Sequence, residues 1–197
     1  MISSDPGDAY KRGATDFFAK PFEEDVVLAR IHNIISLYNR YYTDNVTEGL
    51  NRKGFIRKAE SFLHGKKDKT GYDMMFFDIK NFKAVNELAG ISNGDQVLRT
   101  FYQDLCNASF MPLLVARIEA DHFVCLSRQP EEGYDFLDDI CHCRYEKNGK
   151  AFQLYVQCGI YHLENKNMAI SGMIDRARLA EEMHNSEYGR MYTIYNH

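Results

Sequence analysis

The sequence predicts an α/β (α+β) fold in which a central, mixed but mostly antiparallel sheet is flanked by helices. Apolar runs of strand length alternate with amphipathic segments of helical period along most of the chain. Two pairs of strand-like runs are joined by tight turns, and the stronger turn signal is Asn148-Gly149, because both central residues of a type I′ turn need positive φ. Strands that alternate with helices and also form hairpins indicate a sheet covered by helices.

Composition is that of a folded, soluble protein. The chain has 197 residues, of which 45% are apolar and 13% aromatic, enough to bury a sizeable core in one domain or one domain plus a fragment. The net charge is −4 with acids and bases interspersed, so nothing indicates a nucleic-acid partner. No apolar run approaches the roughly 18 residues of a membrane helix, and signal-peptide features are absent.

The five cysteines are odd in number and lack the Cys-x-x-Cys spacing of zinc sites. Cys141-His142-Cys143 is too tightly spaced for a zinc knuckle. We therefore interpret the cysteines as reduced, mostly buried thiols rather than metal ligands, and expect a cytoplasmic protein.

A helix is predicted from Glu23 to about Tyr42, ahead of the sheet. Its apolar residues recur at spacings of four, three, four and three, which is the a/d seam of a two-stranded coiled coil. Two interpretations follow: a parallel linker helix that forms a homodimer, or an amphipathic helix that packs on its own domain, since two heptads are short for a coiled coil. The seam residues are Val27, Ile31, Ile34, Tyr38 and Tyr41.

The remaining elements follow from periodicity. A helix to about His64 precedes a buried strand, Tyr72 to Phe77, and a helix near Ala84 follows. The next helix, from Asp95 to about Asn107, carries Val97, Leu98, Phe101 and Leu105 on one face. The later elements are strands at Leu113 to Ile118, Phe123 to Ser127, Cys143 to Tyr145 and Phe152 to Tyr161, a helix at Ile174 to His184 and a strand at Tyr192 to Tyr195.

Two polar motifs stand at the ends of these strands. Asp78-Ile79-Lys80-Asn81-Phe82-Lys83 follows the first buried strand, and Glu119-Ala120-Asp121-His122-Phe123 occupies a hairpin turn. A carboxylate at the mouth of a buried strand can hold a divalent metal that carries a triphosphate. On local grounds alone, Asp78 also fits an ordinary turn or capping residue.

Together the two motifs resemble the GGDEF family, the diguanylate cyclases, whose pattern is Asp-x-Asp-x-Phe-Lys followed by Gly-Gly-Asp/Glu-Glu-Phe in a turn. The segment from Asp44 to Phe55 is similar to the family's opening motif, with Glu48 in place of a glycine. The resemblance covers residues 43–197 and implies a nucleotide-cyclase palm with a ferredoxin-like βααββαβ core.

The resemblance also implies the site residues. Asp78, the backbone carbonyl of Ile79 and Asp121 match the family's ligands for Mg²⁺ or Mn²⁺, and Asp121 matches the proposed activator of the attacking 3′-hydroxyl. Asn86 and Asp95 match the guanine-reading pair, and their amide and carboxylate suit the edge of guanine. Asp95 also fits a first-turn helix acid after Ser92.

Two basic residues complete the implied nucleotide site. Lys83 matches the lysine of the first motif, and Arg190, in Gly189-Arg190, is placed to reach a phosphate. The lysine expected just before that pair is absent, and Asn185 or Ser186 stands in its place.

Several departures argue against turnover. Lys80 puts a cation where the family has its second aspartate. Repulsion by this charge should weaken metal binding by several kcal/mol, unless the side chain extends into solvent. Glu119 and Ala120 replace the two glycines, and Glu119 either repels triphosphate or turns outward. His122 replaces a glutamate; we expect an exposed histidine without a role, the alternative being a weak metal ligand.

The family's product-inhibition motif would fall on Phe110 to Leu113, where neither charged residue is present. We therefore expect no cyclic di-GMP binding at that position.

The segment from Gly13 to Phe22, with Lys20-Pro21, looks like the last strand of a response-regulator receiver domain. Residues 1–42 are accordingly expected to be a receiver remnant and linker helix, with Met1 internal and the phosphoacceptor upstream. The ending at Met191 to Tyr195 resembles the junction before a cyclic di-GMP phosphodiesterase (EAL) domain.

Cyclisation needs two metals on each of two facing sites, and this chain lacks too many of those parts. The first hypothesis is a degenerate GGDEF domain of a bacterial two-component or cyclic di-GMP signalling protein that is catalytically inactive, regulatory and able to bind GTP. The alternatives are a weakly active diguanylate cyclase and a dimerisation or relay domain without a ligand.

Overall fold

The computed structural model describes residues 7, 11, 13, 21, 23–89, 91–147, 150–183 and 190–196. The chain divides into two compact units, residues 1–40 and 41–197. Most of the receiver-like segment from Gly13 to Phe22, the Asn148-Gly149 turn, and Asn185, Ser186 and Gly189 lie outside the described residues.

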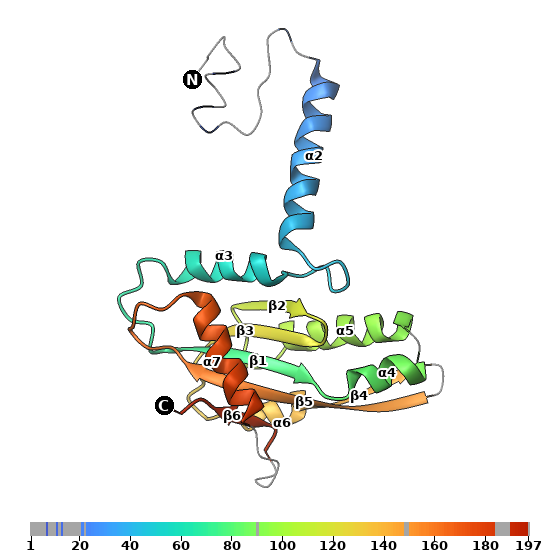
Figure 1. Cartoon of the computed structure of the whole chain (residues 1–197), viewed down its shortest axis with the longest axis vertical. Coiled ribbons are helices and arrows are strands. Elements are labelled where there is room, and N and C mark those ends of the chain that lie inside the picture. Colours follow the sequence, from blue (N-terminus) through green and yellow to red (C-terminus); the bar gives the residue numbers. More distant parts are fainter. Residues whose placement is uncertain are drawn as a thin grey trace. The chain divides into compact units, whose positions relative to one another are not determined.

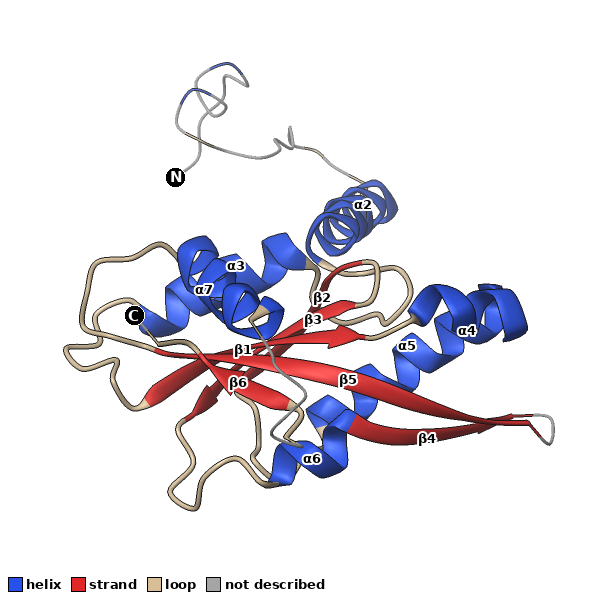
Figure 2. Ribbon diagram, turned by 60° about the horizontal axis from the view of Figure 1, so that its bottom comes forward, coloured by secondary structure: helices blue, strands red, loops and turns tan. Residues whose placement is uncertain are grey.

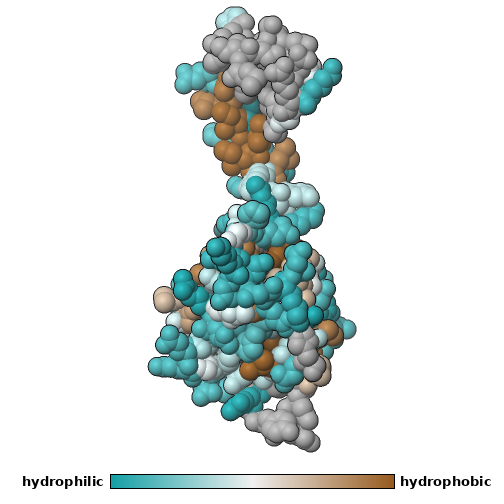
Figure 3. Space-filling model, turned by 90° about the vertical axis from the view of Figure 1, so that its left-hand side faces the viewer, coloured by the Kyte–Doolittle hydropathy of each residue, from teal (hydrophilic) through white to brown (hydrophobic). Residues whose placement is uncertain are grey.

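Helix α2, Glu24–Tyr42, lies where the sequence predicts a helix, and it has no buried residue among those described. Figure 3 shows its apolar side chains as a brown stretch on the surface. Four of the five seam residues, Ile31, Ile34, Tyr38 and Tyr41, are exposed to solvent, as are Val26, Leu28, Ile35 and Leu37 beside them.

The second unit is built on one sheet whose strands are ordered β2-β3-β1-β5-β4, with β6 also paired to β5 (Figure 2). The four pairings along that order are antiparallel, and β6 joins β5 in parallel. This arrangement confirms the mixed, mostly antiparallel sheet predicted from the sequence. The strands are β1 Tyr72–Ile79, β2 Leu114–Glu119, β3 His122–Arg128, β4 His142–Lys147, β5 Lys150–His162 and β6 Tyr192–Ile194.

Helices cover both faces of the sheet (Figure 1). Because side chains alternate along a strand, β1 sends Met74 and Phe76 to one face and Met75 and Phe77 to the other. The first face packs against α3 (Arg52–Leu63) and α7 (Ile170–Glu182). The second face packs against α4 (Phe82–Ala89), α5 (Ile91–Cys106) and α6 (Phe136–Cys141).

The starts of two helices differ from the sequence prediction, and a third helix was not predicted. Helix α5 begins at Ile91 rather than Asp95. Gly94 is a poor helix former, so the sequence does not suggest a helix before it. The helix nevertheless includes Gly94, because a larger residue there would clash with the side chain of Asn86. Helix α7 begins at Ile170 rather than Ile174, and its N-cap Ala169 gives no side-chain capping signal. Helix α6 has only six residues, too few to show a period.

The cysteines are free thiols, and Cys125, Cys141 and Cys158 are buried, as the sequence predicted for most of them. None of the described helices is long and apolar enough to cross a membrane.

A polar clasp joins the start of the domain to the sheet. Arg117 Nη1 donates to both carboxylate oxygens of Asp44 at 3.1 Å, and its Nε donates to the carbonyl of Ala120 at 2.7 Å. The backbone N–H of Thr47 donates to Asp44 Oδ1 at 2.8 Å. Arg117 thus ties the opening turn of the domain to the hairpin turn between β2 and β3.

This clasp predicts a pH dependence of stability. Burial by itself would raise the pKa of Asp44, but hydrogen bonds from Thr47 and the charge of Arg117 outweigh it, so the pKa lies below its usual value. A depressed pKa stabilises the fold above the unfolded-state value and loses that contribution as the pH falls through the folded-state value. One group changes the free energy of unfolding by at most about 1.4 kcal/mol per pH unit, so we expect the contribution of Asp44 to persist above about pH 4, to fall by about 1 kcal/mol by pH 3 and to fall further at lower pH.

The measurement is urea denaturation at a series of pH values for the wild type and Asp44→Asn. The variant should be less stable at neutral pH, and the difference should shrink as the pH falls. Glu60→Gln, which changes an exposed carboxylate on α3, serves as the control and should keep the wild-type profile. A gap between Asp44→Asn and the wild type that stays constant with pH would contradict the role given to Asp44.

Candidate nucleotide and metal site

The two sequence motifs meet where β1 ends and β3 begins. Asp78 and His122 are direct cross-strand partners in the antiparallel register, so their side chains lie on the same face of the sheet. That face is the one covered by α7. A hollow of ≈230 Å³ opens there, lined by Phe76, Asp78, Lys80, His122, Gln157, Arg178, Glu181 and Glu182.

Lys80 is the centre of this site. Its Nζ lies 2.5 Å from Asp78 Oδ2 and 2.5 Å from Glu181 Oε1 on helix α7. The Lys80 side chain is 32% exposed, whereas that of Glu181 is only 4% exposed. The ammonium group therefore does not extend into solvent, which would have left the metal position unhindered. Instead, it links the end of β1 to α7.

The charges of this cluster stabilise one another. Burial alone would raise the pKa of Asp78, but hydrogen bonds from His122 and Lys80 outweigh it and lower that pKa. Burial alone would lower the pKa of Lys80, but the carboxylates of Asp78 and Glu181 outweigh it and raise that pKa. Asp78 is therefore an ionised carboxylate that already has a cation beside it.

His122 is not the exposed histidine that the sequence led us to expect. Its side chain is only 21% exposed, its Nε2 lies 3.5 Å from Asp78 Oδ1, and its Nδ1 lies 3.5 Å from Glu119 Oε1. The ring also packs against Phe76, with centroids 5.2 Å apart. The hydrogen bond to Asp78 raises the pKa of His122, against the opposing effect of burial.

The hairpin turn contains a residue in a backbone conformation that glycine favours. Ala120 has φ 41°, in the left-handed region that glycine favours, and the carbonyl of Ala120 is held by Arg117. Glu119 does not simply turn outward: its Oε1 lies 3.4 Å from Arg178 Nη1 as well as facing His122. Its negative charge therefore stays at the rim of the hollow.

The predicted guanine-reading residues are brought together between α4 and α5. Asn86 is half-buried, and its Oδ1 lies so close to Gly94 that an added Cβ there would sit 1.8 Å from it. Asp95, the next residue, is also half-buried. The close approach of Asn86 to α5 explains why glycine is needed at position 94.

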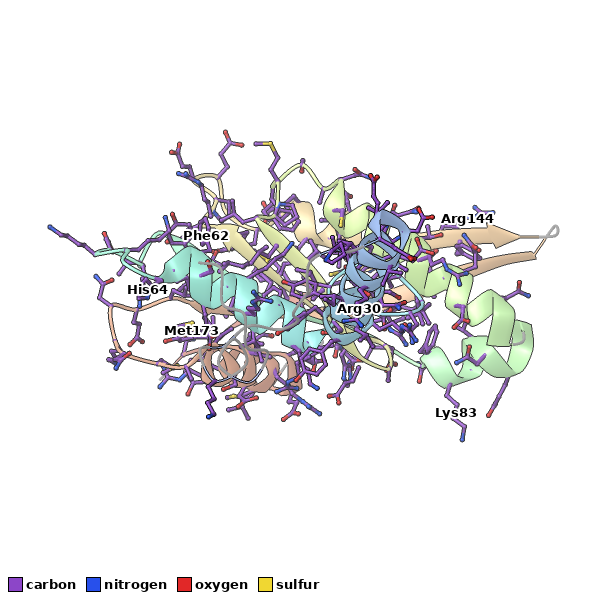
Figure 4. All side chains as sticks on the ribbon, turned by 90° about the horizontal axis from the view of Figure 1, so that it is seen from above. Arg30, Phe62, His64, Lys83, Arg144 and Met173 are labelled. Carbon is purple, nitrogen blue, oxygen red and sulfur yellow. The ribbon has the colours of Figure 1, made fainter. Side chains whose placement is uncertain are left out.

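The two predicted basic residues lie elsewhere. Lys83 is 91% exposed on α4, 3.9 Å from Glu87 Oε1, and Figure 4 shows it pointing away from the sheet. The guanidinium of Arg190 lies 5.7 Å from the ring centroid of Tyr192. Among the described residues, neither Lys83 nor Arg190 lines the hollow.

The predicted metal ligands converge in part. Carboxylate oxygens of Asp78 and Asp121 and a ring nitrogen of His122 all lie within 4.8 Å of one another. The N–H of Ile79 donates to the carbonyl of Asp121 at 3.3 Å, which holds the turn against the end of β1. These three ligands suit one divalent ion. A second ion would need the other carboxylate oxygen of Asp78, which Lys80 already occupies.

Sequence reasoning missed the residues that α7 supplies. Glu181 is 101 positions from Lys80, and nothing local marks it as a partner of the β1 motif. Arg178, one helical turn earlier, contacts Glu119 and Glu182. The available signal was Glu181 itself, an acidic residue on an otherwise apolar face of the helix. Its partner could not be identified without knowing how the helix packs on the sheet.

A palm-like antiparallel sheet with acidic residues at the end of its central strand and in the neighbouring hairpin defines a nucleotide-cyclase type of domain. Comparison with known families makes this specific: residues 41–186 match the family model "Diguanylate cyclase, GGDEF domain". The chain belongs to the GGDEF family, which confirms the resemblance seen in the two motifs.

Solved structures show the same fold. The coiled coil and GGDEF domain of DgcB from Caulobacter crescentus, in complex with c-di-GMP, is 19% identical with a TM-score of 0.70 and covers 96% of this chain and 100% of that chain. The FimX GGDEF domain from Pseudomonas aeruginosa is 16% identical with a TM-score of 0.63, over 78% of this chain and 98% of that one.

A sequence relative is the "Uncharacterized protein in hutH 5'region" of Streptomyces griseus, 32% identical over 92 residues. The match covers 45% of this chain and 38% of that protein, so the chain spans well under half of its relative.

Proposed function

We propose that this chain is a degenerate, regulatory GGDEF domain that binds a guanine nucleotide and does not convert it to cyclic di-GMP. The observation that carries the proposal is the Lys80 ammonium held between Asp78 and the buried Glu181. Cyclisation requires cations that neutralise the triphosphate and activate a hydroxyl. The ammonium group of Lys80, fixed at one oxygen of Asp78, occupies the position of one of these cations. Unlike a metal ion, it cannot activate water or a hydroxyl group.

The hairpin turn supports the same conclusion. Glu119 keeps a negative charge at the rim, where the triphosphate of GTP would approach, and Ala120 adds a methyl group to the turn. Repulsion between Glu119 and phosphate oxygens opposes a productive pose in the hollow. A divalent ion that accompanies the nucleotide, Mg²⁺ or Mn²⁺, would be held by Asp78 and Asp121.

The guanine-binding part of the proposal rests on Asn86 and Asp95. The carboxylate of Asp95 can accept from the N1 and N2 groups of guanine, and the amide of Asn86 can donate and accept at the same edge. Adenine lacks that donor pair, so a site that reads the base through Asn86 and Asp95 should prefer GTP to ATP.

The test is a thermal shift with GTP. At free GTP about ten times its Kd, linkage predicts about 1.4 kcal/mol of stabilisation, or a rise in Tm of about 3–5 °C. The shift should disappear in Asp95→Ala and with ATP. The matched control is Asp104→Ala, which removes an exposed carboxylate from the same helix and should keep the shift.

A product assay with GTP and Mn²⁺ separates the alternatives. No cyclic di-GMP is expected from the wild type. Product that disappears in Asp121→Asn would establish a weakly active cyclase instead, and no thermal shift at millimolar GTP would leave a ligand-free relay domain.

We also propose that helix α2 forms a parallel homodimer through its exposed apolar seam. The likeness to a coiled coil and GGDEF domain supports this geometry. A receiver domain before this helix, and an EAL-type domain after β6, remain expectations from the sequence resemblance.

A further inference from the structure

We infer that Asp78, Asp121 and His122 form a binding site for a single divalent transition-metal ion, with the imidazole of His122 as a ligand that selects such an ion over Mg²⁺. The inference deepens the proposed function, which assigns a nucleotide-borne ion to the same two carboxylates, but it needs no bound nucleotide and can be tested without one.

The distances suit one ion. Asp78 Oδ1 and His122 Nε2 are 3.5 Å apart, and ligand atoms of the three residues all lie within 4.8 Å of one another. Two ligand atoms bound to one tetrahedral zinc at 2.0–2.1 Å are separated by about 3.4 Å. Small side-chain rotations therefore suffice to place all three ligands around a common ion.

The backbone fixes these ligands before any ion arrives. Asp78 and His122 are directly paired across β1 and β3, and the carbonyl of the adjacent Asp121 accepts a hydrogen bond from Ile79 N–H. Cross-strand partners project to the same face, so the carboxylate and the imidazole face each other by register. The packing of the His122 ring on Phe76 further limits its orientation.

The groups around the ligands are those that support a metal-bound histidine. Such a histidine presents its second ring nitrogen to a carboxylate or carbonyl, which fixes its orientation and raises its basicity. His122 Nδ1 is buried and faces a carboxylate, 3.5 Å from Glu119 Oε1. The orientation of the Asp78 carboxylate is also fixed. Its Oδ2 accepts a hydrogen bond from Lys80, and its Oδ1 faces His122.

The donor set determines which ion is preferred. Mg²⁺ demands near-octahedral oxygen ligands, whereas imidazole suits zinc, cobalt, nickel and copper. Lys80 is shared between Asp78 and buried Glu181, so it neutralises one of the three carboxylates of Asp78, Asp121 and Glu181, and the other two negative charges can balance an incoming dication. Because Lys80 stands on the far oxygen of Asp78, the site has room for one ion.

The competing explanation is that His122 forms only an ion pair with Asp78. The experiment is a titration of tag-free protein with Co²⁺ in the absence of nucleotide, followed by visible d–d absorption. We expect one equivalent to bind, Zn²⁺ to displace it, and Mg²⁺ at the same concentration to leave the spectrum and the Tm unchanged. Nitrogen and oxygen ligands should give no thiolate-to-cobalt charge-transfer band, which separates this site from the free cysteines.

Four variants make the test specific. His122→Gln should weaken Co²⁺ and Zn²⁺ binding at least tenfold, and His122→Glu should also shift the preference toward Mg²⁺. His64→Asn, at the far end of α3 in Figure 4, should bind as the wild type does. Asp121→Asn provides an independent ligand removal if a His122 variant does not fold in EDTA.

The inference is overturned if Co²⁺ gives no d–d spectrum up to millimolar concentration, if binding survives unchanged in His122→Gln and Asp121→Asn, or if Mg²⁺ binds as tightly as Zn²⁺. A failure of GTP to bind would leave these results intact, so the two proposals fail separately.

Discussion

Gly159→Ala should destabilise the domain by about 3 kcal/mol, because a methyl group at this position has no space. An added Cβ would lie 1.9 Å from the carbonyl oxygen of Ala177 and 2.4 Å from the backbone nitrogen of Glu181. Both atoms belong to the backbone of α7, so no side-chain rotation relieves the clash. The whole helix must move away from β5, and apolar packing between them is lost.

This displacement has a second consequence for the site. Glu181 reaches Lys80 from the segment of α7 that touches Gly159, so a shift of the helix should also break that ion pair. Loss of packing and loss of the ion pair should therefore appear together in one variant.

Urea denaturation followed by circular dichroism measures the effect. Gly71→Ala is the matched control: nothing lies within 4 Å of its added Cβ, and its stability should stay within about 0.5 kcal/mol of the wild type. A loss below about 1 kcal/mol in Gly159→Ala would show that α7 is not packed as tightly on β5 as described.

Lys80→Met should cost about 2 kcal/mol of the free energy of unfolding. Removing one partner of a fully buried ion pair typically costs about 3–5 kcal/mol, because the other charge stays buried alone. Lys80 is 32% exposed, so water screens part of the effect, but Glu181 is only 4% exposed and loses its cation.

The matched control is Lys83→Met. Lys83 is 91% exposed and its contact with Glu87 spans 3.9 Å, so its loss should change stability by no more than about 0.5 kcal/mol. A double-mutant cycle with Glu181→Gln isolates the pair: Lys80→Met should cost at least about 1 kcal/mol less when Glu181 is already neutral. Additive effects would mean that the two side chains do not interact in solution.

Much of the fold was accessible from the sequence, since strand and helix periods are local properties. The apolar run from Tyr72 predicted β1, and the alternating pattern with hairpin signals predicted a mostly antiparallel sheet. Short or weakly marked elements escaped: α6 has six residues, and the first turn of α5 includes a glycine.

The sequence by itself also determined the chemistry available at the two motifs: Asp78 and Asp121 as carboxylates, Lys80 and His122 as departures from the family pattern. Only the tertiary structure decided what those departures do. The β1–β3 register sets His122 opposite Asp78, and the packing of α7 on Gly159 brings buried Glu181 to Lys80. These contacts join residues far apart in the chain, and their energies depend on burial, which no local pattern of residues specifies.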